Sequence, residues 1–408
     1  MKQEDPPSVP APLSGSADRA LRALSRLSGA PRLSEIQGDE LLMERARFAG
    51  LRFTDGVSAG GSCRLLPARD RFLAVSLPRA TDWELVPAWL ESSTATWTWR
   101  NLAEAIREQD SEALLERARL LGIAMAAAVP PASSPAPACP TRGAPWPASE
   151  DRDTAYPQRR PIVIDLSALW AGPLCAHLLH LCGADVIKVE AMDRPDGARE
   201  GNLPFYRLLN QGKRCVALDF HDPAGRRALC KVLERADIVI ESSRPRALRQ
   251  LGIEPEVLLE HHPALTWVSI TGYGRGEPQA NWIGFGDDAG VAAGLSHVMR
   301  AATGTFQFAG DAIADPLTGI RAALAAWRSW LAGGSRLVSL SLAGVASAGL
   351  AEELEHLGEA GVLQSFGAWW ADVQGRALAP GRPRPVSDHV GALGEHTRTV
   401  LAELDISC

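Results

Sequence analysis

The chain has 408 residues, of which 46% are hydrophobic and 22% charged, so it is long enough for two packed cores. Its formal net charge of −6 argues against a nucleic-acid-binding face, and no apolar run is long enough to span a membrane. The first residues are acidic and rich in proline and serine, so we expect no signal peptide. The seven cysteines form no CxxC pair, and we expect reduced thiols in a cytoplasmic protein with no nucleic-acid or membrane partner.

The N-terminal part predicts a disordered tail followed by a small domain. Residues 1–17 are rich in proline and serine and carry too few apolar side chains to offset the entropy of ordering. After them the apolar spacing predicts helices and one strand, in the order helix 18–28, helix 39–49, strand 71–77, helix 82–91, helix 99–108 and helix 110–122. We therefore expect a small α+β domain over residues 18–128.

The next segment, residues 129–160, holds eight prolines and predicts an interdomain linker. Beyond it, apolar runs alternate with helical patterns. The predicted strands are 162–166, 186–190, 215–220, 237–241, 265–270 and 336–342, and the predicted helices are 172–182, 222–234, 246–259 and 316–331. Wholly apolar strands separated by single helices indicate a parallel sheet covered on both faces. We expect an α/β fold, with a Rossmann-like large domain over residues 161–408.

The turn after the first of these strands lacks a dinucleotide fingerprint. That fingerprint, GxGxxG, brings backbone amides close to a pyrophosphate. Here the turn runs from Ser167 to Pro173, with one glycine and the bulky Trp170, so we do not expect NAD or FAD binding.

Two groups of side chains leave a binding role open. Lys213 and Arg214 precede a strand, with Arg199 upstream, and could hold phosphates or form an ordinary solvated turn. His177 and His180 share one predicted helix but lack further ligands, so a packed pair is favoured over a metal site and we expect no metal.

Acidic residues precede two predicted helices. Asp287 and Asp288 follow a glycine-rich approach, where they could cap the helix or act as an ionised nucleophile. For Asp311 and Asp315, capping is the favoured interpretation. The pair Gly60–Gly61 could form either a mobile loop over a site or a tight turn.

Taken together, these segments resemble the family III coenzyme A transferases. The matching motifs are Val163–Ser167, Ala171–Pro173, Gly183–Glu190, Asp196 with Arg199, Asn210 with 212–214, 236–241, 269–274, Asp315 with 318–319, and 393–401. The resemblance implies a CoA-binding Rossmann-like domain, an interlocked homodimer, and acyl-CoA and carboxylic acid substrates.

The resemblance also implies roles for particular residues. Asp287 or Asp288 would be the nucleophile, and backbone amides in the turn of Trp170, Ala171 and Gly172 would bind the thioester oxygen. The CoA phosphates would contact Arg199, Lys213 and Arg214. The pair Gly60 and Gly61 would be the family's mobile glycine loop, which shields the intermediate from water.

The chain departs from the family pattern in three places. Its small domain precedes the large one, an order that suggests a circular permutation. Ungapped counting places the family's nucleophilic aspartate on Gly286, so Asp287 reaches that space only if the loop is bulged by one residue. The glutamate of the racemase branch falls on Arg79, which argues against racemisation.

The sequence therefore predicts an enzyme that transfers CoA from an acyl-CoA to a carboxylic acid through an aspartyl acyl-enzyme. The alternatives are a CoA-ester-binding protein without transferase activity, or a related thioester reaction such as dehydration or isomerisation with Asp287 or Asp288 as the base.

Overall fold

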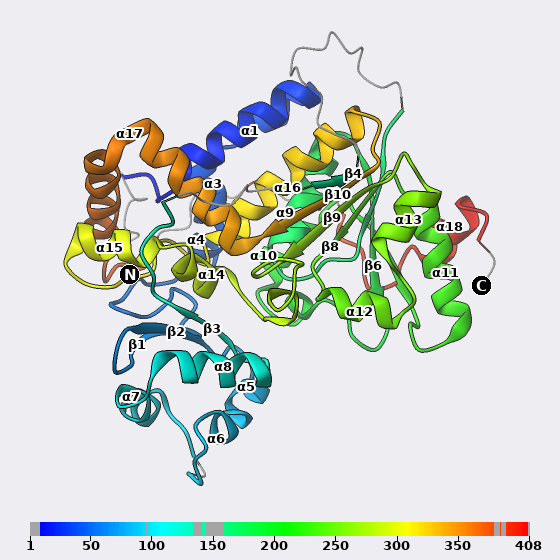
Figure 1. Cartoon of the computed structure of the whole chain (residues 1–408). Coiled ribbons are helices and arrows are strands. Elements are labelled where there is room, and N and C mark those ends of the chain that lie inside the picture. Colours follow the sequence, from blue (N-terminus) through cyan, green and yellow to red (C-terminus); the bar gives the residue numbers. More distant parts are fainter. Residues whose placement is uncertain are drawn as a thin grey trace.

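The computed structural model describes residues 9–94, 96–133, 141–143, 159–378, 384 and 389–406, with only the backbone given for 141–143. Within these residues the chain builds two sheets, shown apart from each other in Figure 1. No helix in the described part of the chain is long and apolar enough to cross a bilayer.

The larger sheet has seven strands in the order β4-β10-β9-β8-β5-β6-β7. Six of them run parallel, and β4 pairs antiparallel with β10 at one edge. The strands are β4 (Thr141–Gly143), β5 (Ile162–Asp165), β6 (Asp185–Ala191), β7 (Arg214–Leu218), β8 (Ile238–Glu241), β9 (Thr266–Thr271) and β10 (Arg336–Ser341). This arrangement confirms the predicted parallel sheet, and it adds a short strand inside the segment expected to be a linker.

Helices cover both faces of this sheet (Figure 1). One face carries α9 (Ala171–Leu181), α16 (Ala314–Leu331) and α17 (Leu342–Val373), and the other carries α11 (Pro223–Glu234), α12 (Pro245–Gln250), α13 (Pro255–His261) and α18 (Thr397–Glu403). Successive strand residues alternate between the two cores, as Val163 and Ile164 do. The remaining helices of this unit are α10 (Leu203–Asn210), α14 (Gly286–Ala292) and α15 (Leu295–Thr303), with short 3₁₀ turns at Gly197–Arg199 and Gln279–Asn281. Helix α10 packs against α9, and α14 and α15 pack against α17.

The smaller sheet is antiparallel, in the order β1-β2-β3. It comprises β1 (Cys63–Pro67), β2 (Phe72–Ser76) and β3 (Ala124–Ala127), and it is covered by α5 (Ala80–Glu84), α6 (Val86–Trp89), α7 (Trp99–Arg107) and α8 (Ser111–Leu121). These elements form the unit at the bottom of Figure 1. A small apolar cluster that includes Cys63, Ala74, Val291 and Phe308 joins this sheet to α14.

The N-terminal helices do not follow the predicted boundary at residue 18. They are α1 (Ser14–Ser28), α2 (Pro31–Ser34), α3 (Gly38–Leu42) and α4 (Glu44–Ala49). Ala11 and Leu13 are buried, and the apolar faces of these helices share one core with α9, α16 and α17. The expected disorder is therefore wrong for residues 9–17, and residues 18–49 pack with the large unit. The rest of the expected tail lies outside the described residues.

The five described cysteines are unpaired: Cys63, Cys175, Cys182, Cys215 and Cys230. The other two, Cys139 and Cys408, lie outside the described residues.

Candidate active site

Helix α14 presents the two acidic residues that the sequence singles out. Phe285 precedes the helix in an extended conformation, and its backbone N–H donates to Asp288 Oδ1 over 2.9 Å. Asp287 turns toward a different partner, because its Oδ1 accepts from the backbone N–H of Ala312 at 3.0 Å. Asp288 thus caps its own helix, whereas Asp287 faces the loop that leads into α16.

The position preceding these acids cannot carry a side chain. A Cβ placed on Gly286 would lie 2.2 Å from the carbonyl oxygen of Ala312 and 2.5 Å from Asp315 Oδ2. The Gly286 N–H also donates to Asp315 Oδ2 at 3.0 Å. An aspartate at position 286 is therefore excluded in this backbone, and the nearest carboxylate on the same helix is that of Asp287.

A cation from the N-terminal helices enters this acidic cluster. Arg45 of α4 donates from Nε to Asp311 Oδ2 at 2.9 Å and from Nη2 to Asp311 Oδ1 at 2.5 Å. Its guanidinium also lies 4.8 Å from the ring centroid of Trp170. Arg45 therefore connects the turn before α9 with the acids around α14, and it was not predicted from the sequence.

Burial raises the pKa of three carboxyls in this cluster. The pKa of Asp287 rises to about 6, because burial and the charge of Asp311 outweigh the attraction of Arg45. The pKa of Asp315 rises to about 7, also through burial, with Arg45 opposing the rise. Burial likewise raises the pKa of Asp288 to about 7, although a hydrogen bond from Tyr273 opposes it.

The surroundings explain this desolvation. A small cavity borders Asp287, and its lining includes the side chains of Val291, Phe308 and Ile313. Asp287 is only 9% exposed and Asp288 is fully buried. Low polarity around a carboxylate disfavours its charged form and makes the remaining anion more reactive toward an electrophile.

The Gly60–Gly61 loop, which precedes β1, lies beside the same cluster. A Cβ on Gly60 would be 3.5 Å from Arg45 Nη2. A hydrogen bond from the Ser58 side chain lowers the pKa of Asp287, and the Gly61 N–H closes the turn onto the Ser58 carbonyl at 2.8 Å. Gly61 has a φ of 76°, a value that favours glycine. The structure thus brings together three of the predicted groups: the glycine pair, the acid pair and, through Arg45, the Trp170 turn.

The turn after β5 adopts a strained backbone. Leu169 has a φ of 69°, although it is not glycine, and its side chain is 49% exposed. Trp170 instead is buried and packs edge-on against Phe205. Gly172 must lack a side chain because a Cβ there would lie 2.2 Å from the Ser167 side chain. These contacts fix the start of α9 at the carboxyl edge of the sheet.

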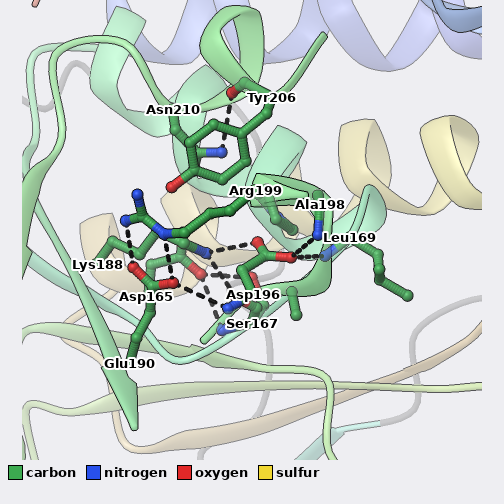
Figure 2. A network of polar contacts seen from close by, with 12 residues as sticks. Asp165, Ser167, Leu169, Lys188, Glu190, Asp196, Ala198, Arg199, Tyr206 and Asn210 are labelled. Atoms are coloured by element: carbon green, nitrogen blue, oxygen red, sulfur yellow. Dashed lines mark hydrogen bonds and ion pairs between the residues drawn. The ribbon is translucent and has the colours of Figure 1, made fainter. Parts of the chain in front are cut away.

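A buried network of charges holds that turn in place (Figure 2). Lys188 pairs with Asp196 at 3.0 Å and donates to the Ser167 carbonyl at 2.9 Å. Asp196 in turn accepts from the backbone N–H of Leu169 at 3.0 Å. The network therefore ties the loop after β5 to the loop after β6.

Lys213 belongs to this buried network, contrary to its expected role in phosphate binding. Its side chain is 0% exposed, and Nζ donates to Asp165 Oδ2 at 2.8 Å, to the Pro173 carbonyl at 3.0 Å and to Asn210 Oδ1 at 3.0 Å. These three contacts use all three ammonium donors. The expectation for Lys213 is therefore corrected, because no donor remains for a ligand.

The other two expected phosphate ligands are also paired within the chain. Arg199 donates to both carboxylate oxygens of Glu190, at 2.9 and 2.6 Å, and stacks on Tyr206 (Figure 2). Arg214 pairs with Asp185 at 2.5 Å and with Glu403. Their main contacts are internal, and the turn at 213–214 does not form a free cationic patch.

A different set of arginines lies in the loops that follow β6 and β8, at the carboxyl edge of the sheet. Arg244 and Arg246 follow β8 directly, and Arg194 follows β6. Burial lowers the pKa of Arg244, and the charges of Arg246, Arg194 and Arg79 lower it further. Among the described residues, no acid lies within ion-pair distance of Arg194, Arg244 or Arg246. The sequence signal for this cluster was Arg244-Pro-Arg246 immediately after a predicted strand, but these arginines were not among the residues predicted to bind a ligand.

These arginines lie where the strand order reverses. From β5 the chain builds β6 and β7 on one side and then β8, β9 and β10 on the other. The backbone N–H of Ala168, after β5, donates to Ser242 Oγ, after β8, at 3.2 Å. Ligands of open α/β sheets bind at such a crossing of the strand order, outside the carboxyl ends of the strands.

The two histidines on α9 lie with their ring centroids 6.2 Å apart. Burial lowers the pKa of His177 well below its ordinary value. Over the part of the chain that the structure describes, no three His, Cys, Asp or Glu side chains converge as a metal site would require.

Comparisons with known proteins point to one family. The sequence profile of CoA-transferase family III matches residues 161–364. An acyl-CoA transferase of Fusarium pseudograminearum is 32% identical over 173 residues, which cover 39% of this chain and 38% of that protein. The succinate–glutarate CoA-transferase of Agrobacterium fabrum is 32% identical over 185 residues, covering 41% and 46%.

A further curated protein and a solved structure are also similar to this chain. The mouse succinyl-CoA:glutarate CoA-transferase is 30% identical over 177 residues, covering 42% of this chain and 41% of that protein. The crystal structure of Rv3272 from M. tuberculosis is similar with a TM-score of 0.45 and 28% identity, covering 49% of this chain and 57% of that one. The chain thus spans less than half the length of the curated relatives it matches.

Proposed function

The chain belongs to CoA-transferase family III, and from this premise we propose that it transfers CoA from an acyl-CoA thioester to a carboxylic acid, with Asp287 as the nucleophile. The observation that carries the proposal is the placement of Asp287 at the start of α14, beside Arg45 and the Gly60–Gly61 loop. A carboxylate with a pKa of about 6 is mostly ionised at neutral pH and needs no separate base.

The proposed reaction exchanges one thioester for another. The Asp287 carboxylate attacks the thioester carbon of the donor, the C–S bond breaks, and the thiolate leaves behind a mixed anhydride. The thiolate then attacks the aspartyl carbonyl, forming an aspartyl thioester and releasing the donor acid. The acceptor carboxylate attacks this thioester to give a second anhydride and free thiolate, and thiolate attack on its acyl carbon restores Asp287 and yields the new acyl-CoA.

The choice between the two neighbouring acids follows from their contacts. Both oxygens of Asp288 accept hydrogen bonds, from the Phe285 N–H at 2.9 Å and from the Tyr273 hydroxyl at 2.5 Å. Asp288 is fully buried and its pKa is about 7. We therefore give Asp288 a positioning role, in which it holds the start of α14 so that Asp287 faces the substrate.

The CoA portion would lie along the carboxyl edge of the sheet. Arg194, Arg244 and Arg246 would bind its phosphates, in place of Lys213, since cations without an acid partner attract phosphate groups. The exposed side chains of Leu169 and Met192 would supply apolar contacts beside them. The turn from Trp170 to Gly172 and the glycine loop would then enclose the thioester and exclude water.

We also propose that the protein works as a homodimer, as the family resemblance implies. Sedimentation equilibrium tests this directly: a mass of twice the 43.6 kDa chain supports it, and a mass equal to one chain contradicts it.

An isotope-exchange assay tests the proposed transfer. The protein is incubated with an acyl-CoA and the matching radiolabelled carboxylic acid, and the label entering the thioester is counted. Asp287→Asn should abolish exchange, because the amide still accepts the Ala312 hydrogen bond but is a far weaker nucleophile. The control is Asp405→Asn, at an exposed turn position with a φ of 56° that asparagine tolerates. Exchange that survives in Asp287→Asn, or that the unchanged protein lacks, contradicts the proposal.

A further inference from the structure

The small unit contributes one arginine to the rim of the site. Arg79 lies at the start of α5, and its side chain is 48% exposed. Its Nε donates to Asp82 Oδ2 at 3.2 Å, and its Nη2 lies 3.1 Å from Asp82 Oδ1. The described residues supply no acid other than Asp82 within ion-pair distance.

This pairing occupies only one edge of the guanidinium. Arginine has five N–H donors arranged as a rigid fork, and Asp82 engages the edge formed by Nε and Nη2. The edge that includes Nη1 can receive a second carboxylate in a bidentate geometry. Asp82 is itself 4% exposed and accepts from the Arg79 backbone N–H at 2.9 Å, so it holds the arginine in a defined orientation.

The position of Arg79 relates it to the proposed nucleophile. Its guanidinium carbon lies 5.8 Å from the ring centroid of Phe285, which caps α14 two residues before Asp287. Strands β2 and β3, which precede and follow this part of the small unit, both pack against α14, and β2 does so through Ala74 and Val291. Arg79 also adds positive charge to the surroundings of Arg244. Arg79 and Arg244 therefore lie close enough for their charges to interact, and an anionic group placed between them is attracted to both.

On the basis of the proposed function, we propose that Arg79 binds the far carboxylate of the acyl group, so that the preferred substrate is the mono-CoA thioester of a dicarboxylic acid. With the thioester carbon at Asp287, a short acyl chain extends past Phe285 toward the open edge of the guanidinium. An arginine that is fixed in this orientation favours an acyl chain that ends in a carboxylate. It disfavours a chain that ends in a methyl group, because that chain leaves the open edge of the guanidinium without a partner.

Succinyl-CoA and butyryl-CoA test this inference, because both acyl chains have four carbons and only succinyl carries a far carboxylate. The kcat/KM of each is taken from the initial rate at which its radiolabelled acid exchanges into the thioester. The unchanged protein should show a kcat/KM for succinyl-CoA about 10- to 100-fold above that for butyryl-CoA. Arg79→Gln should lower this ratio at least about tenfold, and Arg79→Lys should restore part of it, since the charge returns without the fork.

The ratio is taken within one preparation, so loss of folded protein cancels from it. Arg100→Gln is the matched control, because Arg100 lies in the same unit on α7 with its side chain 91% exposed and should leave the ratio unchanged. Equal rates for the two thioesters in the unchanged protein, or an unaltered ratio in Arg79→Gln, overturn this inference alone. Absence of exchange with both thioesters overturns this inference, whereas the proposed function fails only if the isotope-exchange assay is negative with other acyl-CoAs as well.

Discussion

Replacing Arg45 with methionine tests how the site keeps Asp287 ionised. Arg45 lowers the pKa of Asp287, which burial raises to about 6 despite this attraction. At pH 7 a carboxyl with that pKa is ionised in about ten molecules for each protonated one. An opposite charge within about 4–6 Å changes this ratio by about 10- to 1,000-fold. Without the cation, at most about half of the Asp287 carboxyls remain ionised at pH 7.

The assay is the single-turnover release of the donor carboxylic acid from acyl-CoA, followed from acidic to alkaline pH. The rate of the unchanged protein should rise with pH through about 6, as Asp287 ionises. For Arg45→Met the rise should move to higher pH, so that the defect of about 2- to 100-fold at pH 7 shrinks in alkali. A defect of the same size at every pH, or no defect, refutes this role of Arg45. Arg100→Met, at an exposed arginine, should keep the original profile.

A second variant separates this effect from unfolding. Arg45→Met leaves Asp311 buried without its cation, and breaking a buried pair costs about 3–5 kcal/mol, less here because the Arg45 side chain is 31% exposed. Arg45→Met combined with Asp311→Asn removes that stranded charge. In the double variant two opposite charges near Asp287 are lost, but Asp311 raises the pKa of Asp287 by less than Arg45 lowers it. The neighbouring carboxyls of Asp288 on α14 and Asp315 on α16 are unchanged. The double variant should therefore keep a smaller shift in the same direction.

Three other substitutions probe separate parts of the site. Gly286→Ala should lower the free energy of unfolding by about 1–3 kcal/mol in urea titrations, because the alanine Cβ would clash with the Ala312 carbonyl oxygen. An unchanged urea midpoint would contradict the close contact between Gly286 and Ala312. Asp287→Asn should stabilise the fold at pH 8 by up to about 3 kcal/mol but not at pH 4. Because folding raises the pKa of Asp287, the stability that this carboxyl contributes is present in acid and is lost as the pH rises through about 6, and asparagine avoids that loss. Equal shifts of the melting temperature at both pH values would argue against this. Arg244→Gln should raise KM for acyl-CoA about tenfold and weaken the dependence of KM on salt concentration. Arg249 is exposed, and Arg249→Gln should change neither quantity. Equal effects of the two substitutions would exclude Arg244 from the proposed phosphate site.

The parallel sheet was predictable because its strands are short, wholly apolar and separated by single helices. The pattern could not show where a helical stretch breaks. The predicted helix 246–259 is two helices, because Gly252 adopts a φ of 76° and Pro255 begins the next one. The short strands β1 and β3 escaped prediction because alanine and proline give them little strand character.

Some residues of the candidate site could likewise be predicted from the sequence and others could not. The acids and the glycine pair stand out in the sequence because each lies next to a helix or strand start. Arg45 does not stand out, since its contact with Asp311 joins residues 266 positions apart. Lys213 shows the converse limit: a lysine in a predicted turn looks solvated, and only the folded chain reveals that Asp165 lies 2.8 Å from its ammonium group. The circular permutation stays a prediction.

The most direct test of Asp287 as the nucleophile is to locate the acyl-enzyme. The protein is incubated with acyl-CoA and hydroxylamine, digested, and its peptides are sequenced by mass spectrometry. We expect a hydroxamate on Asp287 and none in Asp287→Asn. A hydroxamate on Asp288 or Asp315 instead, or none anywhere although acyl-CoA is consumed, would contradict the proposed mechanism.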